Sequence, residues 1–264
     1  MTPAATVEAA GVPLAFEESG DGPPVVFVHG TATARTVWRE TLTALGPRVR
    51  AIVYDRRAYG DSGAPEPYGG TTVGEQADDL AALVRSLDAA PAVLVGHELG
   101  ALACLDVMLR YAELVKAAVL IEPSMLWLSA GGTDALSALR EVVEKAARER
   151  GAAAAVEAFL EAVDGPAAVK MLGEDRLGAA QATPRAFAAD LTAAASWPAG
   201  RRELRQIDAP ATVVSGELSS PVRREAASAL VRLLPNAELR PVRAGHLAQV
   251  EVPADVADAI AACV

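Results

Sequence analysis

The stretch Val93-Leu94-Val95-Gly96-His97-Glu98-Leu99-Gly100-Ala101 decides the fold of this chain. An apolar run is followed by a turn framed by two glycines and then by a helical pattern, which predicts a strand, a sharp turn and a helix. This is the layout of a nucleophile elbow, normally written G-x-S-x-G, whose central residue sits at a strained turn in the active site. Here the central residue is Glu98. Because a carboxylate cannot react as a serine hydroxyl does, serine acyl chemistry is the function that the sequence most directly disfavours.

The composition and charge of the chain exclude several classes of partner. With 264 residues, 52% of them hydrophobic, the chain is long enough for one large α/β domain with a deep core. The net charge of −10 and the absence of a Lys/Arg-rich run argue against nucleic acid or a membrane as a partner. No apolar run approaches the roughly 18 residues of a spanning helix, and Met1–Glu8 lacks the layout of a signal peptide. We therefore expect a cytoplasmic protein, either a monomer or a homodimer.

The sequence carries no pattern that would hold a metal or a cofactor. Its two cysteines, Cys104 and Cys263, lie in apolar helical patterns without metal-ligand spacing. It has neither a phosphate-binding glycine-rich loop with a lysine nor a dinucleotide fingerprint. We therefore expect no cofactor and no metal.

Strand-like and helical patterns alternate along most of the chain, which predicts a parallel sheet covered on both faces. Alternating apolar residues at 12–16 predict an early antiparallel strand, and Pro13 favours the sheet edge for it. The short, wholly apolar run 25–28 predicts a buried strand. Further strands are predicted at 49–54, 92–95, 117–121, 211–215 and 238–242. Apolar spacing predicts helices at 72–87, 99–111, 222–234 and after Pro253. Asp78 and Asp79 of the first of these helices should face solvent.

The pattern changes in the middle of the chain. Between residues 124 and 207 no strand-like run appears, and Ala-, Leu- and Glu-rich helical segments such as 136–150 and 152–163 dominate. Strand signals return only at residue 211. We interpret this as a core formed by residues 1–123 and 208–264, interrupted by an all-helical insertion, 124–207.

Four landmarks follow predicted strands in a fixed order. They are Phe27-Val28-His29-Gly30-Thr31, the stretch from Asp55-Arg56-Arg57 to Gly60-Asp61-Ser62, the elbow around Glu98, and Gly245-His246. A single dipeptide such as His-Gly carries little information. With the four landmarks in this order, the chain resembles the α/β-hydrolase-fold superfamily over essentially its whole length. The resemblance implies an α/β-hydrolase fold, with a mostly parallel eight-stranded sheet, helices on both faces and a helical cap formed by residues 124–207.

The resemblance also implies a catalytic base and an acid that orients it. His246 follows the last predicted strand, in the loop where the family places its base. The commonest position of the acid is held here by Ser219, whereas Glu122 stands at the end of the strand after the elbow. Haloalkane dehalogenases and zearalenone-type lactonases are similar in having a Glu at that strand end. Glu122 is therefore the predicted partner of His246, with Glu217 as the alternative acid.

The fold implies an oxyanion hole made of backbone N–H groups as well. We expect it to be formed by Leu99, directly after the elbow centre, and by Thr31, which follows Gly30 in the loop after the third strand. His29 is expected to support this loop rather than to react. His97 flanks the elbow centre, and its side chain is expected to point away from the site.

Three interpretations of Glu98 stay open. In the first, which we favour, an apolar pocket raises the pKa of Glu98, which then acts with His246 in acid/base chemistry, with Glu122 in support. Cyclisation, dehydration, isomerisation or epoxide opening by an internal hydroxyl, in secondary metabolism, would fit. In the second, Glu98 forms an ester with the substrate, and in the third the protein binds a ligand without turnover. The sequence also permits a serine esterase or lactonase altered at position 98.

Two members of the ester class are disfavoured by particular residues. Dehalogenases hold the halide with an Asn and a Trp, and Thr31 and Leu99 stand in their places. Epoxide hydrolases usually use tyrosines of the cap, and all four tyrosines of this chain lie outside residues 124–207. The side chain of Glu98 is also one methylene longer than that of Asp, which displaces the attacking oxygen.

The substrate is expected to be a hydrophobic small molecule. The predicted insertion carries large apolar side chains at its start, middle and end, and Met125, Trp127, Met171 and Trp197 are the candidates for substrate contact. Pockets for apolar ligands are lined in this way. Together these residues favour a neutral, polyketide- or lactone-like molecule.

Overall fold

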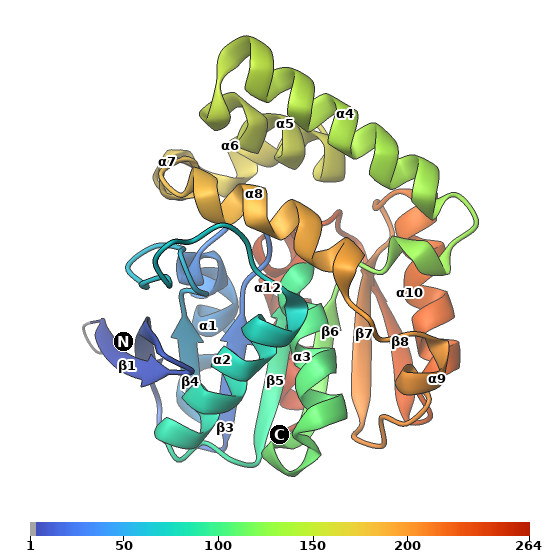
Figure 1. Cartoon of the computed structure of the whole chain (residues 1–264). Helices are drawn as coiled ribbons and strands as arrows, with labels where there is room; N and C mark the ends of the chain where they lie inside the picture. Colours follow the sequence, from blue (N-terminus) through green and yellow to red (C-terminus); the bar gives the residue numbers. More distant parts are fainter. Residues whose placement is uncertain (1–3) are drawn as a thin grey trace.

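The computed structural model describes residues 4–264, which form one eight-stranded sheet (Figure 1). The strands are β1 (Ala5–Ala9), β2 (Val12–Ser19), β3 (Pro24–Val28), β4 (Arg50–Tyr54), β5 (Ala92–His97), β6 (Val115–Ile121), β7 (Ala211–Gly216) and β8 (Ala237–Val242). Their order is β1-β2-β4-β3-β5-β6-β7-β8, antiparallel from β1 to β4 and parallel from β4 to β8. The expected fold is confirmed. Residues 1–3, which begin the predicted core segment and the Met1–Glu8 stretch, lie outside the described residues.

The central strands separate two hydrophobic cores. Successive side chains of a strand point to opposite faces, and in β3 the side chains of Val26 and Val28 join one buried cluster while those of Val25 and Phe27 join the other. Strand β5 alternates in the same way. Both faces of these strands are therefore buried, which explains why their sequences are continuous apolar runs.

Helices cover the sheet on both faces (Figure 1). The first cluster contains residues of α2 (Val73–Ser86), α3 (Leu99–Arg110) and α10 (Pro221–Leu233), and the second contains residues of α1 (Arg39–Leu45) and α12 (Pro253–Ala261). Helix α2 begins with a capping box, in which Thr72 accepts from the N–H of Glu75 and the Glu75 carboxylate accepts from the N–H of Thr72. Shorter elements are η1 (Arg35–Trp38), η2 (Gly46–Arg48), η3 (Ala112–Leu114) and α11 (Ala248–Glu251).

The chain between β6 and β7, which we call the helical insertion, places α4 to α8 in a layer beyond the carboxyl ends of the parallel strands, whereas α9 lies lower, beside α10 (Figure 1). Its elements are η4 (Leu126–Leu128), α4 (Gly132–Arg150), α5 (Ala152–Asp164), α6 (Ala168–Leu172), α7 (Glu174–Gln181), α8 (Pro184–Ala193), η5 (Ala194–Ser196) and α9 (Arg201–Leu204). Gly151, Gly165 and Gly173 end α4, α5 and α6 with φ of 90°, 84° and 85°. Glycine adopts this left-handed conformation without strain, so each glycine lets the chain reverse between consecutive helices.

Two expectations drawn from the sequence are wrong. Pro13 does not mark the sheet edge, because β1 pairs with β2 and occupies the edge itself, with Glu8 opposite Pro13. Asp79 does not face solvent: it is buried, and its carboxylate accepts from Nε of Arg57 at 2.7 Å and from Nη2 at 2.8 Å. Helical spacing alone could not show Asp79 turned inward, because its partner Arg57 lies in the loop after β4.

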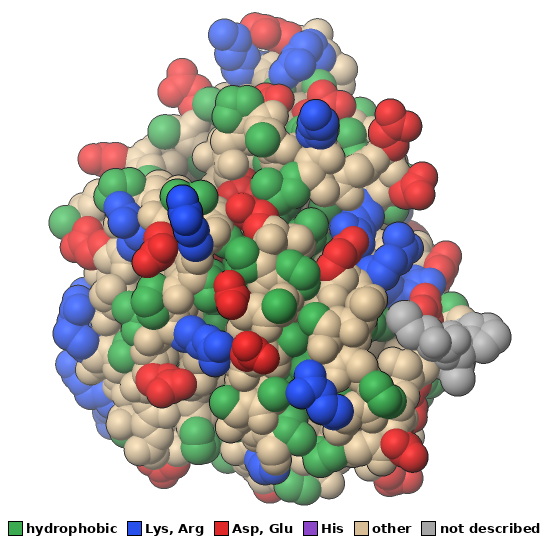
Figure 2. Space-filling model, turned by 180° about the vertical axis from the view of Figure 1, so that it is seen from behind, with side chains coloured by type: hydrophobic (Ala, Val, Ile, Leu, Met, Phe, Trp, Pro, Cys, Tyr) green, Lys and Arg blue, Asp and Glu red, His purple; other side chains and the backbone are tan. Residues whose placement is uncertain are grey.

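The surface carries charges of both signs. On the face shown in Figure 2, Lys/Arg and Asp/Glu side chains are interspersed among apolar ones and no histidine is visible. All three histidines of the chain are buried. Within residues 4–264, no helix is both long enough and apolar enough to cross a membrane.

Candidate active site

The turn between β5 and α3 holds Glu98 in a backbone conformation that few residues adopt, with φ 53° and ψ −112°. Glycines on both sides make the turn possible, since a Cβ on Gly96 would lie 2.6 Å from Cα of Ala101 and one on Gly100 2.2 Å from the carbonyl oxygen of Val28. Strand and helix therefore approach more closely than side chains would allow. The turn places the Glu98 side chain at the N-terminus of α3, where the helix dipole favours an anion.

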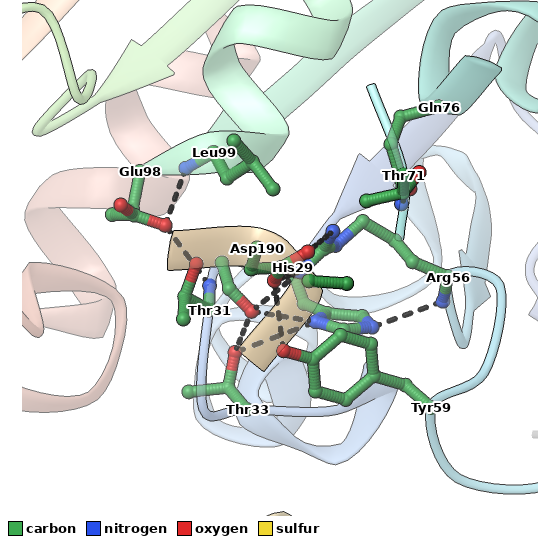
Figure 3. A network of polar contacts seen from close by, with 12 residues as sticks. His29, Thr31, Thr33, Arg56, Tyr59, Thr71, Gln76, Glu98, Leu99 and Asp190 are labelled. Atoms are coloured by element: carbon green, nitrogen blue, oxygen red, sulfur yellow. Dashed lines mark hydrogen bonds and ion pairs between the residues drawn. The ribbon is translucent and has the colours of Figure 1, made fainter. Parts of the chain in front are cut away.

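The Glu98 carboxylate lies between two backbone N–H groups (Figure 3). Its Oε2 accepts from the N–H of Thr31 at 3.0 Å and from the N–H of Leu99 at 2.6 Å. The side chain is only 5% exposed. The structure thus brings both predicted oxyanion-hole groups to a single carboxylate oxygen. That the N–H groups of Thr31 and Leu99 stabilise an oxyanion during a reaction stays a prediction.

The electrostatics of Glu98 differ from the expectation. Burial by itself raises its pKa, but the N–H of Thr31, the nearby His246 and the N–H of Leu99 outweigh burial and lower the pKa from 4.5 to about 2. Hydrogen bonds to the charged form of a carboxyl group favour that form. The expected raised pKa is therefore wrong, and Glu98 is ionised at neutral pH.

The loop after β3 is held in place by its own histidine (Figure 3). Nε2 of His29 accepts from the N–H of Arg56 at 3.0 Å, so Nδ1 carries the proton and donates to the carbonyl oxygen of Gly30 at 2.9 Å. The same carbonyl accepts from the hydroxyl of Thr33 at 2.9 Å. A Cβ on Gly30 would lie 3.0 Å from Cβ of Glu98, so this position has no room for a side chain. His29 supports the loop that presents Thr31.

His246 and Glu122 lie together at the ends of β8 and β6. Nδ1 of His246 is 3.4 Å from Oε2 of Glu122, and both side chains are buried. Oε1 of Glu122 accepts from the N–H of Gly216 at 2.7 Å. Glu217, the alternative acid, is exposed, and Ser219 is buried close by. The geometry therefore pairs His246 with Glu122 rather than with Glu217.

The His246–Glu122 pair carries a neutral histidine. Burial and then Arg223 lower the pKa of His246 well below its ordinary value, although Glu98 raises it. Burial raises the pKa of Glu122, while the N–H of Gly216 and the charge of Arg223 act against burial. A neutral His246 that donates from Nδ1 to Glu122 leaves Nε2 as a proton acceptor. This is the form that a general base needs.

His97 contacts the loop of His246 and not the substrate side of the elbow. Its Nε2 donates to the carbonyl oxygen of His246 at 2.9 Å, and the two rings lie 4.7 Å apart between centroids. Burial and then the neighbouring His246 lower the pKa of His97 to about 3. His97 is therefore neutral, and it ties the elbow to the loop that carries the base.

Sequence reasoning missed Asp164, the last residue of α5. Its carboxylate accepts from the backbone N–H of His246 and, at 3.2 Å, from that of Leu247. The N–H of Gly245 is held by Oε1 of Glu251 at 2.9 Å. The helical insertion thus fastens the loop that carries His246. No sequence signal marks Asp164, because the contact joins segments 82 positions apart.

Sequence reasoning also missed a buried ion pair, Arg56–Asp190, that joins the helical insertion to the loop after β4 (Figure 3). Nη2 of Arg56 donates to Asp190 of α8 at 2.5 Å and to the carbonyl oxygen of Gly30 at 3.1 Å. The hydroxyl of Tyr59 donates to Asp190 at 2.7 Å. In the sequence, Arg56 stands out only as part of the stretch from Asp55 to Ser62 that follows the strand 49–54. Its position there gave no sign of a partner in the insertion.

A cavity of about 400 Å³ lies between the elbow and the helical insertion. Glu98, Thr31, Ser124 and Asp190 form its polar lining, and the rest is apolar: Leu126, Trp127, Leu136, Leu139, Phe159, Leu191, Ala194, Ala195, Trp197, Pro198, Ala199 and Gly200. Of the four residues expected to contact substrate, Trp127 and Trp197 line this cavity. Met125 is instead fully buried in the core, and Met171 lies outside the lining.

The described residues offer no metal site. Among residues 4–264, no group of three or more His, Cys, Asp or Glu side chains could hold a metal ion. Cys104 is buried in α3 and Cys263 lies just beyond α12, and both are free thiols. Of the three predicted catalytic residues, Glu98 lines the cavity, and His246 and Glu122 do not.

Comparison with known proteins agrees with the fold. The model of the alpha/beta hydrolase family matches residues 25–259, so the chain belongs to this family. It is 30% identical over 237 residues to 2-(acetamidomethylene)succinate hydrolase of Mesorhizobium japonicum, covering 87% of this chain and 83% of that one. An epoxide hydrolase of Caballeronia sordidicola is 39% identical over 92 residues, 34% of this chain and 28% of that one.

A solved structure is similar over nearly the whole chain. The esterase RhEst1 of Rhodococcus sp. ECU1013 is 25% identical and superimposes with a TM-score of 0.80, covering 99% of this chain and 98% of that one. The chain is thus similar to hydrolases and esterases. Its own elbow carries a glutamate.

Proposed function

We propose that the protein is a hydrolase that works through a covalent ester on Glu98 and acts on an uncharged, hydrophobic epoxide. The observation that carries the proposal is the position of Oε2, within 3.0 Å of the N–H of Thr31 and 2.6 Å of the N–H of Leu99. The extra methylene of Glu98 therefore does not carry the carboxylate past the predicted oxyanion hole. One oxygen is anchored there, and Oε1 is the nucleophile.

In the first step, Oε1 of ionised Glu98 attacks a carbon of the epoxide ring. A carbon–oxygen bond to Glu98 forms, the ring carbon–oxygen bond breaks, and the ring oxygen takes a proton from water. A pKa of about 2 keeps Glu98 in the anionic form that this attack requires. Residues 124–207 contain none of the tyrosines that epoxide hydrolases usually use, and the hydroxyls that line the cavity, those of Thr31 and Ser124, are weak acids. We therefore expect ring opening to be slow.

In the second step, His246 takes a proton from water, which attacks Cδ of the Glu98 ester. The developing oxyanion is Oε2, already held by the N–H groups of Thr31 and Leu99. The bond between Cδ and Oε1 then breaks, Oε1 takes the proton from His246 and leaves as a hydroxyl of the diol, and the water oxygen stays on Cδ, which regenerates the Glu98 carboxylate after loss of a proton. Glu122 orients His246 and stabilises its protonated form.

The alternative acid/base interpretation of Glu98 loses its main support. A general acid or base works best when its pKa lies near the operating pH, whereas the pKa of Glu98 is lowered to about 2. Cyclisation or isomerisation would therefore have to depend on His246 alone. Dehalogenation stays disfavoured, since Thr31 and Leu99 replace the side chains that hold a halide.

The cavity favours an uncharged substrate. Its lining contains two carboxylates, Glu98 and Asp190, and no Lys or Arg. Asp190 is neutralised by Arg56. A dicarboxylate, such as the name of the Mesorhizobium relative suggests for that enzyme, would meet the negative charge of Glu98 without a cation to balance it.

The ester can be trapped by removing the base. We expect His246→Gln, incubated with a long-chain terminal epoxide, to gain the mass of one substrate molecule on the peptide that contains Glu98. The double variant His246→Gln/Glu98→Gln should gain none. If the single variant binds the epoxide but shows no adduct on Glu98, the proposed function is wrong.

A further inference from the structure

A second hollow adjoins the candidate active-site cavity on the outer side of the helical insertion. It has a volume of about 390 Å³ and is lined by residues of α4 and α8 and by Ala195 of η5. Both hollows lie near the lower end of the 300–1,000 Å³ range typical of small-molecule sites. Neither the mechanism nor the predicted substrate contacts make use of the outer hollow.

The two hollows share one wall. Leu136 and Leu139 of α4, Leu191 of α8 and Ala195 of η5 line both of them. Leu191 is 37% exposed although it is a large apolar side chain. Aliphatic side chains that remain uncovered between two hollows are a surface on which an apolar chain can lie.

Away from this wall, the lining of the outer hollow becomes polar. Its outer rim is formed by the hydroxyls of Thr133, Ser137 and Thr192 and by Arg140, which donates to Glu144 at 2.6 Å. Because Arg140 and Glu144 neutralise each other, the rim offers no net charge to a ligand. The lining therefore runs from ionised Glu98 inside, over aliphatic side chains, to an uncharged polar rim at the surface.

We propose that the two hollows form one elongated binding site for a linear aliphatic chain. The reactive end lies at Glu98, and the chain crosses Leu136, Leu139 and Leu191 to reach the outer hollow. Only the position of the reactive end rests on the proposed function. The preference for a long chain rests on the shared wall alone.

This proposal predicts a steep dependence of affinity on chain length. Each added methylene that is buried should tighten binding up to about fourfold, the equivalent of the transfer free energy of one CH₂ group. A compact or cyclic ligand would fill the inner cavity only, and longer chains would then gain nothing.

Binding of primary alcohols, which cannot react with Glu98, tests the preference without turnover. By titration calorimetry on the whole protein, affinity should rise steadily from about four to about ten carbons. Affinity that stops rising once the inner cavity is full would overturn the proposal. Alcohol binding involves no reaction, so it can support the elongated site even if the ester trap fails. Equally, the ester trap can succeed even if alcohol binding shows no preference for long chains.

Substitutions in the two hollows test where the aliphatic ligand lies. In Leu139→Trp the larger side chain should block the passage between the two hollows. It should weaken binding of the longest alcohol about tenfold or more, with little effect on the shortest. Thr192→Trp narrows the outer hollow from an exposed position and should act in the same way without disturbing the core. Val142→Trp, on an exposed residue of α4 that lines neither hollow, is the control and should bind as wild type. Equal binding of the longest alcohol to Thr192→Trp and to Val142→Trp would overturn the proposal.

Discussion

The ends of β5 and β6 carry the same residue type in almost the same setting, yet with opposite electrostatics. Glu98 and Glu122 both have a positive φ, 53° and 46°, and both are buried. Two backbone N–H groups converge on one oxygen of Glu98 and lower its pKa to about 2. Glu122 receives one backbone N–H and a neutral histidine, and burial raises its pKa. The positions of hydrogen-bond donors, rather than the extent of burial, therefore decide the direction in which each pKa is shifted.

This comparison assigns the two glutamates different tasks. An anion that two N–H groups hold at the elbow is placed to attack a substrate, because Glu98 lines the cavity. Glu122 contacts His246 and lies outside the cavity lining, so we propose that it acts on the base and not on the substrate.

The largest effect is expected from Glu98→Gln. The amide keeps the shape of the side chain but is not a nucleophile, so kcat with a terminal epoxide should fall by at least about 10⁴-fold. Binding of an unreactive alcohol should persist, and calorimetry checks it. Glu98→Asp, which keeps the charge but withdraws from Thr31, should lose less activity than Glu98→Gln. A comparable loss of kcat in both variants would mean that the charge of Glu98 is not what supports turnover.

Glu122→Gln should slow the second step and spare the first. An uncharged partner no longer stabilises protonated His246, so steady-state turnover should fall about 10³- to 10⁴-fold. The ester on Glu98 should then accumulate, and rapid quenching followed by mass analysis of the peptide measures it. Slow turnover without accumulated ester would place Glu122 in the first step and break the comparison.

A smaller loss is expected from Asp164→Asn. The amide supplies one acceptor where the carboxylate binds two backbone N–H groups, so the loop of His246 should shift and kcat should fall about 10- to 100-fold. KM should change little, since Asp164 lies outside the cavity lining. Glu161→Gln, at an exposed acid on the same helix, is the matched control. A loss that appears in KM alone would argue against a positioning role.

The smallest effects concern stability. The folded state lowers the pKa of Glu98 below its unfolded value, so its stabilising effect is present above pH 4.5 and is lost as the pH falls toward about 2. The folded state raises the pKa of Glu122, so its effect is present below pH 4.5 and is lost as the pH rises through the raised pKa. Urea unfolding of Glu98→Gln and Glu122→Gln against wild type should therefore give free-energy differences with opposite pH slopes. Slopes of the same sign would contradict the comparison.

The sequence predicted the fold because its strongest signals are local. Continuous apolar runs mark the buried strands, and glycines at 96 and 100 mark a turn that no larger residue permits. The order of the landmarks then places Glu98, Glu122 and His246 at one edge of the sheet. The structure brings Glu122 and His246 together there, with 3.4 Å between Oε2 and Nδ1.

The rest depended on contacts between distant segments. The pKa of Glu98 depends on the N–H of Thr31, 67 residues away, which was expected at the oxyanion hole but not as a donor to the Glu98 carboxylate. Asp164 and Asp190 lie in helices of ordinary composition, and their partners, in the loops after β8 and β4, lie 82 and 134 positions away. Asp79 was assigned to the wrong face for the same reason, since Arg57 is its partner.

The account rests on the claim that Glu98 makes a bond, and a single turnover in heavy-oxygen water tests this most directly. With enzyme in excess over a terminal epoxide, water attacks Cδ of the ester. Mass analysis of the Glu98 peptide should therefore show heavy oxygen in its carboxylate, while the first diol released carries the light oxygen of Oε1. Heavy oxygen in the first diol, with an unlabelled Glu98 peptide, would show that water attacks the substrate directly and would contradict the account.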